Sequence, residues 1–482
     1  MRPDILCIYP NSIQKDGDSV FFMTKTEKGV MLGVSGPDMA AFDGEEVSRQ
    51  GRAYKLCPLT VKNAGEIRKR FDFTNPKSHK GRSITLGLGD RLGLASGGHI
   101  RLLRGLDVFP VLAQQSMREL NLTGRTYEEV LADAVWAVFR EGYTKGYGAD
   151  GDHLKTHEEV KNALDCGYTM ITLDCSEHIQ NRFTSAPQSE VDAHYAALPA
   201  DTIRALEKDY LGKTFPVDGE LAIEFCPADF RRMVLIYLPA IGHVLSIYNE
   251  LIKGIDVDFE VSIDETQSAT LPAQHFFVAN ELIRQGVEIT SLAPRFVGEF
   301  QKGIDYRGDV SDFERDFALH AKIADKFGYK VSVHSGSDKF SIFPAVGKLT
   351  KGRYHVKTAG TNWLEAVRVI AAHAPGLYRE MHAFALENLP EARKYYHIVG
   401  EPANIPDIDS MTDAELPGLM DKDDSRQILH ITYGLILQAK AEDGSPLFRD
   451  RIYEVLAQYE PEYFAALKTL FDRHLTTLGV EI

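Results

Sequence analysis

A unit of helix, glycine and strand, repeated along most of the chain, constrains the fold more than any other feature of the sequence. Three of the helical segments begin with the capping boxes Thr126-x-x-Glu129, Thr156-x-x-Glu159 and Ser311-x-x-Glu314. Capping side chains bond the first free backbone amides of a helix, and the glycine after each segment takes the left-handed conformation that ends one. Strands that alternate with helices in this way predict βαβ units and a parallel sheet.

Eight apolar segments occupy the strand positions of this pattern. They are residues 83–89, 108–114, 147–152, 168–174, 257–264, 287–293, 329–334 and 353–357. Eight parallel strands, each followed by a helix, close a (β/α)₈ barrel of the TIM type. We therefore predict an α/β fold with a catalytic barrel over residues 81–375, interrupted by an insertion at about 177–227 between the fourth and fifth strands.

The segments on either side of the predicted barrel have other patterns. Residues 1–80 contain short apolar runs broken by Gly, Pro, Asn and Asp, which predicts a small β-rich accessory domain. Residues 376–482 are mostly helical in pattern and predict a helical extension. The most apolar run, residues 233–247, contains Pro239 and is too short to cross a bilayer, so we predict a buried helix there.

Net charge and cysteine content limit the partners of the chain. The formal charge is −15, which argues against binding to a nucleic-acid backbone or to an anionic membrane. The five cysteines are odd in number and lack the CxxC spacing of structural metal sites, which favours a reducing cytoplasm. We expect a small-molecule ligand, while the oligomeric state stays open and includes a homo-oligomer.

Polar residues gather where the predicted strands end. In a (β/α)₈ barrel the catalytic groups project from the carboxyl ends of the strands, so a set of titratable side chains at those ends predicts an active site. The set comprises Asp90, Arg91, Gln114, Gln115, Ser116, Asp150, Asp152, His153, Asp174, Asp264, Glu265, Arg295, His334, His355 and Lys357.

Histidines and acidic residues in this set predict a site for one divalent metal ion. A lone histidine is more often a polar-tipped core residue than a ligand. His334 and His355 are exceptions because they share the inward parity of adjacent strands, and His153 because it lies beside two aspartates. We predict His153, Glu265, His334 and His355 as ligands, with Asp264 as the alternative to Glu265. Imidazoles with a carboxylate suit Zn, Mn or Ni.

The remaining motifs leave two interpretations open. The Ser335-Gly336-Ser337 segment is either a cradle for an anion or a tight turn after the strand. Arg295 and Lys357 are candidates for binding a substrate carboxylate or enolate, or they form salt bridges with strand-end aspartates. Gly87-x-Gly89 follows a strand, but the chain lacks the rest of a dinucleotide fingerprint.

Four segments together resemble a known family. Residues 148–156, 334–339, 355–362 and 424–430 are similar to the tagaturonate/fructuronate epimerases, a family that includes tagatose 4-epimerases. The resemblance implies a metal-dependent isomerase that interconverts D-tagaturonate and D-fructuronate, or the ketohexoses tagatose and fructose. The inverted carbon bears a hydroxyl and is β to the ketone. Asp152-His153 and the turn after His334 are also loosely similar to class II aldolases, which serve as a mechanistic analogy.

The position of that carbon suggests retro-aldol chemistry. Its own C–H is not acidified by the ketone, so we hypothesise cleavage of the neighbouring bond and re-addition on the other face. Asp152 is the predicted base, Asp174 the alternate, and Lys357 lies near the enolate in this hypothesis. The predicted substrate-binding residues are Arg91, Gln114, Gln115, Ser116, Arg295, Ser335 and Asp338, and Arg426 and His430 are candidates to reach the site from the C-terminal helices.

Three other functions stay open from the sequence. A ketose isomerase or an enediol-type epimerase would move a proton at the carbon next to the ketone, and a class II-type aldolase would release the cleaved fragments. A sugar-binding protein without catalysis is the alternative outside enzymes. We weigh it least, because a barrel rim this rich in titratable groups is typical of catalysis.

Overall fold

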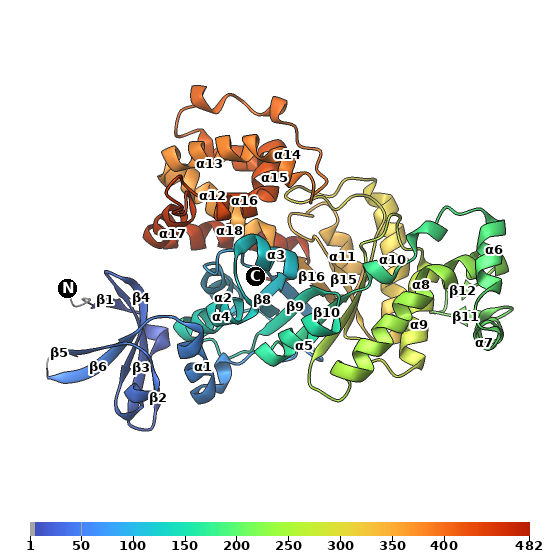
Figure 1. The fold of residues 1–482 in the computed structure, drawn as a ribbon, viewed down its shortest axis with the longest axis horizontal. Coiled ribbons are helices and arrows are strands. Elements are labelled where there is room, and N and C mark those ends of the chain that lie inside the picture. Colours follow the sequence, from blue (N-terminus) through green and yellow to red (C-terminus); the bar gives the residue numbers. More distant parts are fainter. Residues whose placement is uncertain (1–4, 50) are drawn as a thin grey trace.

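The computed structural model describes residues 5–49 and 51–482 and places three parts side by side (Figure 1). A closed barrel of parallel strands lies in the centre, an antiparallel sheet lies at the N-terminal side, and a group of helices lies above the barrel in this view. This arrangement confirms the predicted fold class, a (β/α)₈ barrel with a β-rich N-terminal part and a helical C-terminal extension.

The barrel strands pair in the order β7-β8-β9-β10-β13-β14-β15-β16, and β16 pairs again with β7. Each strand pairs in parallel with its neighbours, as a right-handed βαβ chain requires. Their bounds are β7 Ile84–Leu88, β8 Phe109–Ser116, β9 Gly148–Leu154, β10 Met170–Asp174, β13 Asp258–Ile263, β14 Ser291–Pro294, β15 Lys330–Val333 and β16 Tyr354–Thr358. All eight lie within or beside the segments that the sequence predicts.

The helices around the barrel begin and end largely as the capping pattern predicts. They are α2 Ser96–Leu103, α4 Tyr127–Glu141, α5 His157–Cys166, α8 Pro227–Ile247, α9 Pro272–Arg284, α10 Val310–Phe327, α11 Phe343–Leu349 and α12 Gly360–His373. Both sides of the capping boxes of Thr126 and Thr156 form, and α10 ends at a left-handed Gly328. The box predicted at Ser311 does not form, because the carboxylate of Asp309, two residues earlier, accepts from the first amides of α10.

The segment between β10 and α8 lies outside the regular barrel pattern. It contains η4 Ser176–His178, η5 Asn181–Phe183, α6 Gln188–Ala196, α7 Ala200–Tyr210 and a hairpin of β11 Thr214–Pro216 with β12 Ala222–Glu224. Tyr210 packs its ring against Phe225, Phe230 and Phe277, which attaches this segment to α8 and α9. Figure 1 shows it at the far side of the barrel from the N-terminal sheet.

Helix α8 carries the most apolar stretch of the chain. It contains Pro239 and continues as a π-helical turn over Tyr248–Ile252. Among the described residues, Pro227–Ile252 is the one helix long and apolar enough to span a membrane, and half of its apolar window is buried inside the protein. The helix packs against α6 and α9 as part of the ring around the barrel, which accounts for its apolar faces.

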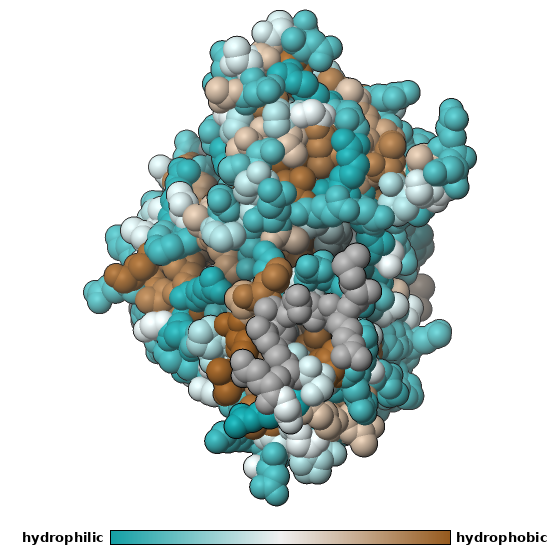
Figure 2. All heavy atoms as spheres, turned by 90° about the vertical axis from the view of Figure 1, so that its left-hand side faces the viewer, coloured by the Kyte–Doolittle hydropathy of each residue, from teal (hydrophilic) through white to brown (hydrophobic). Residues whose placement is uncertain are grey.

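The N-terminal part is a six-stranded antiparallel sheet followed by α1 Val61–Arg70. Its strands are β1 Ile5–Ile8, β2 Gln14–Asp16, β3 Ser19–Thr26, β4 Gly29–Ser35, β5 Glu45–Arg49 and β6 Arg52–Cys57. Phe21 packs against Phe42 and Phe71, and Phe71 contacts Phe139 of α4, so the sheet joins the barrel through aromatic contacts. The face turned to the viewer in Figure 2 is mostly hydrophilic, with apolar side chains in separate groups.

The C-terminal extension lies over the mouth of the barrel. Its helices are α13 Pro375–Glu387, α14 Leu389–Ala392, α15 Asp423–Ile431, α16 Tyr433–Gln438, α17 Arg449–Gln458 and α18 Glu460–Thr477. The Trp363 indole of α12 donates to the Leu429 carbonyl of α15. A Cβ at Gly360 would lie 1.8 Å from the His430 ring, so glycine at the start of α12 is what allows α15 this close to the strand ends.

Candidate active site

A β-bulge at the end of β9 sets the geometry of the site. Ile171 of β10 pairs with Gly151, and Leu173 pairs with Leu154, so β9 has one residue more than β10 in this interval. His153 takes a left-handed φ of 54° there. A regular strand would turn neighbouring side chains to opposite faces, whereas here Asp152 and His153 both line one cavity.

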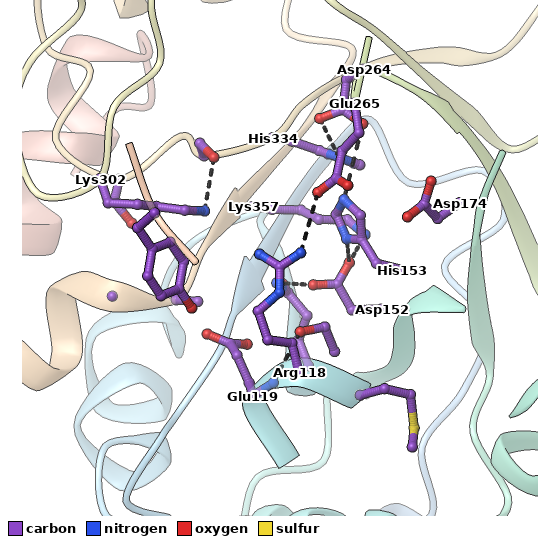
Figure 3. Close-up of a pocket in the computed structure, with 18 of the residues that line it drawn as sticks. Arg118, Glu119, Asp152, His153, Asp174, Asp264, Glu265, Lys302, His334 and Lys357 are labelled. Atoms are coloured by element: carbon purple, nitrogen blue, oxygen red, sulfur yellow. Dashed lines mark hydrogen bonds and ion pairs between the residues drawn. The ribbon is translucent and has the colours of Figure 1, made fainter. Parts of the chain in front are cut away.

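Two imidazoles and a carboxylate meet at this point. One nitrogen of His153, one of His334 and a carboxylate oxygen of Asp264 lie within 4.8 Å of one another. His334 Nδ1 is 3.2 Å from Asp264 Oδ2, and His153 Nε2 is 4.0 Å from Asp264 Oδ1. Figure 3 shows the three side chains converging at one end of the cavity; His153 lies in β9, and Asp264 and His334 directly follow β13 and β15. These atoms are the donor set that a metal ion of the zinc type prefers.

Each of these imidazoles is held by a second carboxylate through its other nitrogen. His153 Nδ1 is 2.8 Å from Asp152 Oδ1, and His334 Nε2 is 2.7 Å from Glu260 Oε1. Carboxylates in this position fix the tautomer and the orientation of metal-binding histidines. The pairing leaves His153 Nε2 and His334 Nδ1 directed at Asp264, which is the arrangement of a preformed cation site.

Lys357 is buried beside this cluster and is surrounded mainly by acidic groups. Its Nζ is 2.8 Å from Asp150, 2.7 Å from Asp152 and 3.0 Å from Glu260, and it also donates to the Thr172 hydroxyl. An ammonium has three N–H groups, and these neighbours occupy them. The geometry therefore makes Lys357 the counter-ion that positions the carboxylates, and does not favour the predicted contact with an enolate.

Burial and neighbouring charges shift the pKa values of these groups in opposite directions. Burial alone would raise the pKa of Asp152, but Lys357 and His153 hold that pKa well below its usual range. The pKa of Glu260 is likewise low despite its burial, because of Lys357 and His334. Burial lowers the pKa of His334, yet Asp264 outweighs it and raises the value to about 10. Without a cation the histidines carry the positive charge that balances the carboxylates.

The cluster opens into a cavity of about 290 Å³ at the carboxyl ends of the strands. Of the predicted residues, Arg91, Gln114, Ser116, Asp152, His153, Asp174, Glu265, His334, Ser335 and Lys357 line it. Gln114 reaches the cavity because Gly87 on the neighbouring strand lacks a Cβ, which would lie 1.7 Å from the Gln114 amide oxygen. Asp174 faces the cavity, and its Oδ2 is 3.4 Å from the Nζ of Lys155.

Two predicted metal ligands lie apart from the donor cluster. His355 faces the barrel interior one layer deeper, where its Nδ1 is 2.8 Å from the Thr85 hydroxyl and its ring stacks on His79. Burial lowers the pKa of His355 to about 3. Glu265 follows Asp264 with the opposite parity and lies at the cavity rim, 4.0 Å from Arg118. Asp264, the alternative to Glu265 as a predicted metal ligand, is the carboxylate that lies beside the two histidines.

Three predicted substrate-binding residues are not brought to the cavity. Gln115 follows Gln114 on β8 and is buried on the opposite face of the strand. Asp338 is buried and forms an ion pair with Arg426 at 2.7 Å, so it anchors α15. Arg295 directly follows β14 and lines an adjoining hollow, which shares Asp264, Lys302 and His334 with the cavity.

Some residues of the site were not among the predicted functional residues. Glu260 is the clearest case, and its parity with Ser262 and Asp264 on β13 was a usable indication. The others come from segments without strand periodicity: Arg118 and Glu119 of α3 Met117–Thr123, Lys302 of the loop after β14, and Tyr396 of the extension. His430, predicted as a candidate, lines the cavity from α15.

Comparison with known proteins gives a consistent result over the whole chain. A family model described as tagaturonate epimerase matches residues 9–478. A tagaturonate/fructuronate epimerase of Thermotoga maritima is 41% identical over 476 residues, covering 98% of this chain and 96% of the relative. The native crystal structure of the fructuronate-tagaturonate epimerase of Cohnella laeviribosi is 50% identical with a TM-score of 0.95, covering 100% of this chain and 97% of that one.

A glycerol-complexed crystal structure of the same Cohnella protein gives the same picture. It is 51% identical with a TM-score of 0.95, and the match covers 98% of this chain and 96% of that chain. Fold, length and sequence therefore agree with the family that the four motif segments resemble. The chain belongs to the tagaturonate epimerase family.

Proposed function

We propose that this protein is an isomerase that interconverts D-tagaturonate and D-fructuronate by inverting the hydroxyl-bearing carbon β to the ketone. The observation that carries the proposal is the meeting of His153, Asp264 and His334 with Asp152 in one cavity at the barrel mouth. The family and the names of its relatives supply the substrate pair. We extend the proposal to a cytoplasmic enzyme and to slower turnover of the ketohexoses tagatose and fructose.

The donor atoms fit one divalent cation. His153, Asp264 and His334 would hold it, and three protein ligands leave positions open for substrate oxygens. When bound, the ion would act as a Lewis acid that withdraws electron density from the substrate ketone. Two imidazoles and one carboxylate accept Zn, Mn and Ni alike, so the proposal names the site and not the element.

The protein groups around this site can carry the proton transfers of a retro-aldol inversion. Asp152 is ionised, faces the cavity and lies 3.5 Å from the Gln114 amide. In the proposed reaction Asp152 accepts the proton of the β-hydroxyl as the bond between the α- and β-carbons breaks. The products are an aldehyde fragment and an enediolate fragment. After the aldehyde turns over, the bond forms again on its other face and Asp152 returns the proton.

A time course by proton NMR in D₂O tests the activity and the mechanism together. We expect fructuronate to convert to tagaturonate with metal-replete protein and not with chelator-treated protein. Retro-aldol inversion leaves the C–H of the inverted carbon intact, so that position should contain no deuterium. Deuterium there would replace the mechanism with proton abstraction, and no conversion by metal-replete protein would reject the proposed function.

Asp152→Asn is expected to lower kcat by about 10²- to 10⁴-fold at saturating metal, the usual contribution of a general base. The matched variant is Asp174→Asn, because Asp174 ends the neighbouring strand β10 and lines the same cavity without belonging to the donor cluster. We expect this variant to lose much less activity, since Lys155 and the Ser176 amide already engage the Asp174 carboxylate. A larger loss in Asp174→Asn would transfer the role of base to that residue.

A further inference from the structure

The cavity contains a lysine that forms no ion pair with any carboxylate of the described residues, although Glu119 and Glu265 lie near enough to act on its charge. Lys302 lies in the loop between β14 and α10 and is half-buried, and Figure 3 shows its ammonium directed into the cavity. Among the described residues, the hydrogen-bond partner of the Lys302 ammonium is the Ser335 hydroxyl at 2.9 Å. Within the described part of the chain it forms no ion pair, although burial lowers its pKa. An unpaired ammonium in such a place is costly unless an anion joins it.

The other cations that line the cavity are already paired. Arg91 is 3.0 Å from Glu119 and stacks on the Tyr433 ring at 3.6 Å. Lys155 pairs with Asp174 and Glu177, and Lys357 pairs with three carboxylates. Arg118 is the nearest rival, but it is about half exposed and faces Glu265 at 4.0 Å. Lys302 is therefore the cation best placed to gain a carboxylate partner.

The backbone on both sides of Lys302 is fixed by Lys339, from the segment between β15 and α11, and by Arg426, from α15 of the extension. Lys339 donates to the Gln301 and Ile304 carbonyls at 2.9 and 2.6 Å, and Arg426 donates to the Gly303 carbonyl at 2.7 Å. Such contacts hold a binding group in place before the ligand arrives, which lowers the entropic cost of binding. The extension thus has a physical role at the site, because it holds the Lys302 loop against the barrel mouth.

Ser335 connects this cation to the metal-type cluster. It directly follows His334, and it has a left-handed φ of 49°, a conformation uncommon for residues other than glycine. Strain of this kind occurs at functional sites, where the surroundings enforce it. Lys302, Ser335 and His334 all line the same cavity, so one ligand there can meet both the ammonium and the cluster.

We propose that Lys302, with the Ser335 hydroxyl, binds the terminal carboxylate of the sugar acid and makes the enzyme prefer hexuronates over neutral ketohexoses. This inference rests on the proposed function. In a hexuronate the carboxylate and the ketone lie toward opposite ends of the carbon chain, and Figure 3 shows Lys302 on one side of the cavity and the His153–Asp264–His334 cluster on the other. The carboxylate stays on the aldehyde fragment after cleavage, so the same contact retains that fragment in the site.

The test compares D-gluconate with D-sorbitol, two six-carbon ligands that differ in one carboxylate and neither of which is a ketone. Titration calorimetry on metal-replete protein measures both dissociation constants. In Lys302→Met we expect the Kd for gluconate to rise about 30-fold, as for loss of a charge-assisted hydrogen bond. The Kd for sorbitol should not change, and Lys302→Arg should restore most of the gluconate affinity because it keeps the charge.

Two control variants separate a binding role from a structural one. Lys326→Met makes the same replacement at an exposed position of α10 and should leave both constants unchanged. Lys302→Met should keep the thermal midpoint of the wild type, since it removes no ion pair. A lowered midpoint together with equal losses for gluconate and sorbitol would show a structural lysine and overturn the proposal.

Three further results would contradict the assignment of the carboxylate contact to Lys302. Unchanged gluconate binding in Lys302→Met, absence of gluconate binding in the wild type, or loss of gluconate binding in Arg118→Met alone would each overturn the assignment to Lys302. These results do not depend on turnover. A wild-type protein that discriminates gluconate through Lys302 but never epimerises fructuronate would reject the proposed function and leave the carboxylate site standing.

Discussion

Replacing His334 by alanine is expected to abolish binding of the proposed metal ion and to lower kcat/KM for fructuronate by about 10³-fold or more. His334 supplies one of the three donor atoms and joins the site to Glu260 through its other nitrogen. Lewis-acid stabilisation contributes several kcal/mol to a transition state, which corresponds to losses of this size. Metal content by mass spectrometry and kinetics on the same sample measure both effects.

Acidic variants at the same site distinguish the ligand from its neighbour. Asp264→Asn should lose the metal, whereas Glu265→Gln should keep it, because Glu265 lies at the rim beside Arg118. Glu260→Gln should keep the ion with affinity lowered about 10- to 100-fold, as for a group that orients a ligand. A His334→Ala protein with a full metal content would contradict the assignment of His153, Asp264 and His334 as ligands. Metal loss in Glu265→Gln alone would show that Glu265, the ligand predicted from the sequence, binds the ion.

The barrel was predictable because its pattern is local and repeated. Capping residues at Thr126 and Thr156, glycines after helices and apolar strand segments each have a short-range physical cause. Strand parity also placed His334 and Lys357 in the interior. The same rule, applied to β13, favours Asp264 over Glu265, since Glu260, Ser262 and Asp264 share one face.

The parts that the sequence did not predict depend on contacts between distant segments. The bulge that turns both Asp152 and His153 inward is a property of the β9–β10 pairing. The simple alternation of side chains along a strand does not predict it. The depth of His355 depends on how far its strand is shifted along the barrel. Lys302 lies in a loop, where the backbone is held by hydrogen bonds from Arg426 and Lys339 to the neighbouring carbonyls, and these contacts join segments far apart in the sequence.

Replacing Lys357 by methionine is expected to destabilise the fold by about 3–5 kcal/mol, the usual cost of removing one partner of a buried ion pair. The change would leave Asp150, Asp152 and Glu260 buried beside one another without their shared counter-ion. Burial already raises the pKa of Asp150 to about 6 even with Lys357 present. Denaturant unfolding, followed by circular dichroism, measures the change in the free energy of unfolding.

A second buried lysine of the barrel provides the matched control for this prediction. Lys330 lies deeper and donates to His79, the Arg82 carbonyl and Thr85, and the described residues form no ion pair with it. Burial lowers the pKa of Lys330 to about 7. Because this group carries less charge and balances no carboxylate directly, Lys330→Met should cost clearly less than Lys357→Met.

A double variant tests whether unbalanced charge causes the loss of stability in Lys357→Met. In Lys357→Met the added change Asp150→Asn removes one of the stranded carboxylates, so it should recover part of the lost stability although it deletes a further native group. On the wild-type background Asp150→Asn removes a partner of Lys357 and should destabilise. If the charge balance around Lys357 holds these strands, Asp150→Asn should raise the free energy of unfolding in Lys357→Met and lower it in the wild type. Equal destabilisation on both would mean that packing, and not the ammonium, holds these strands together.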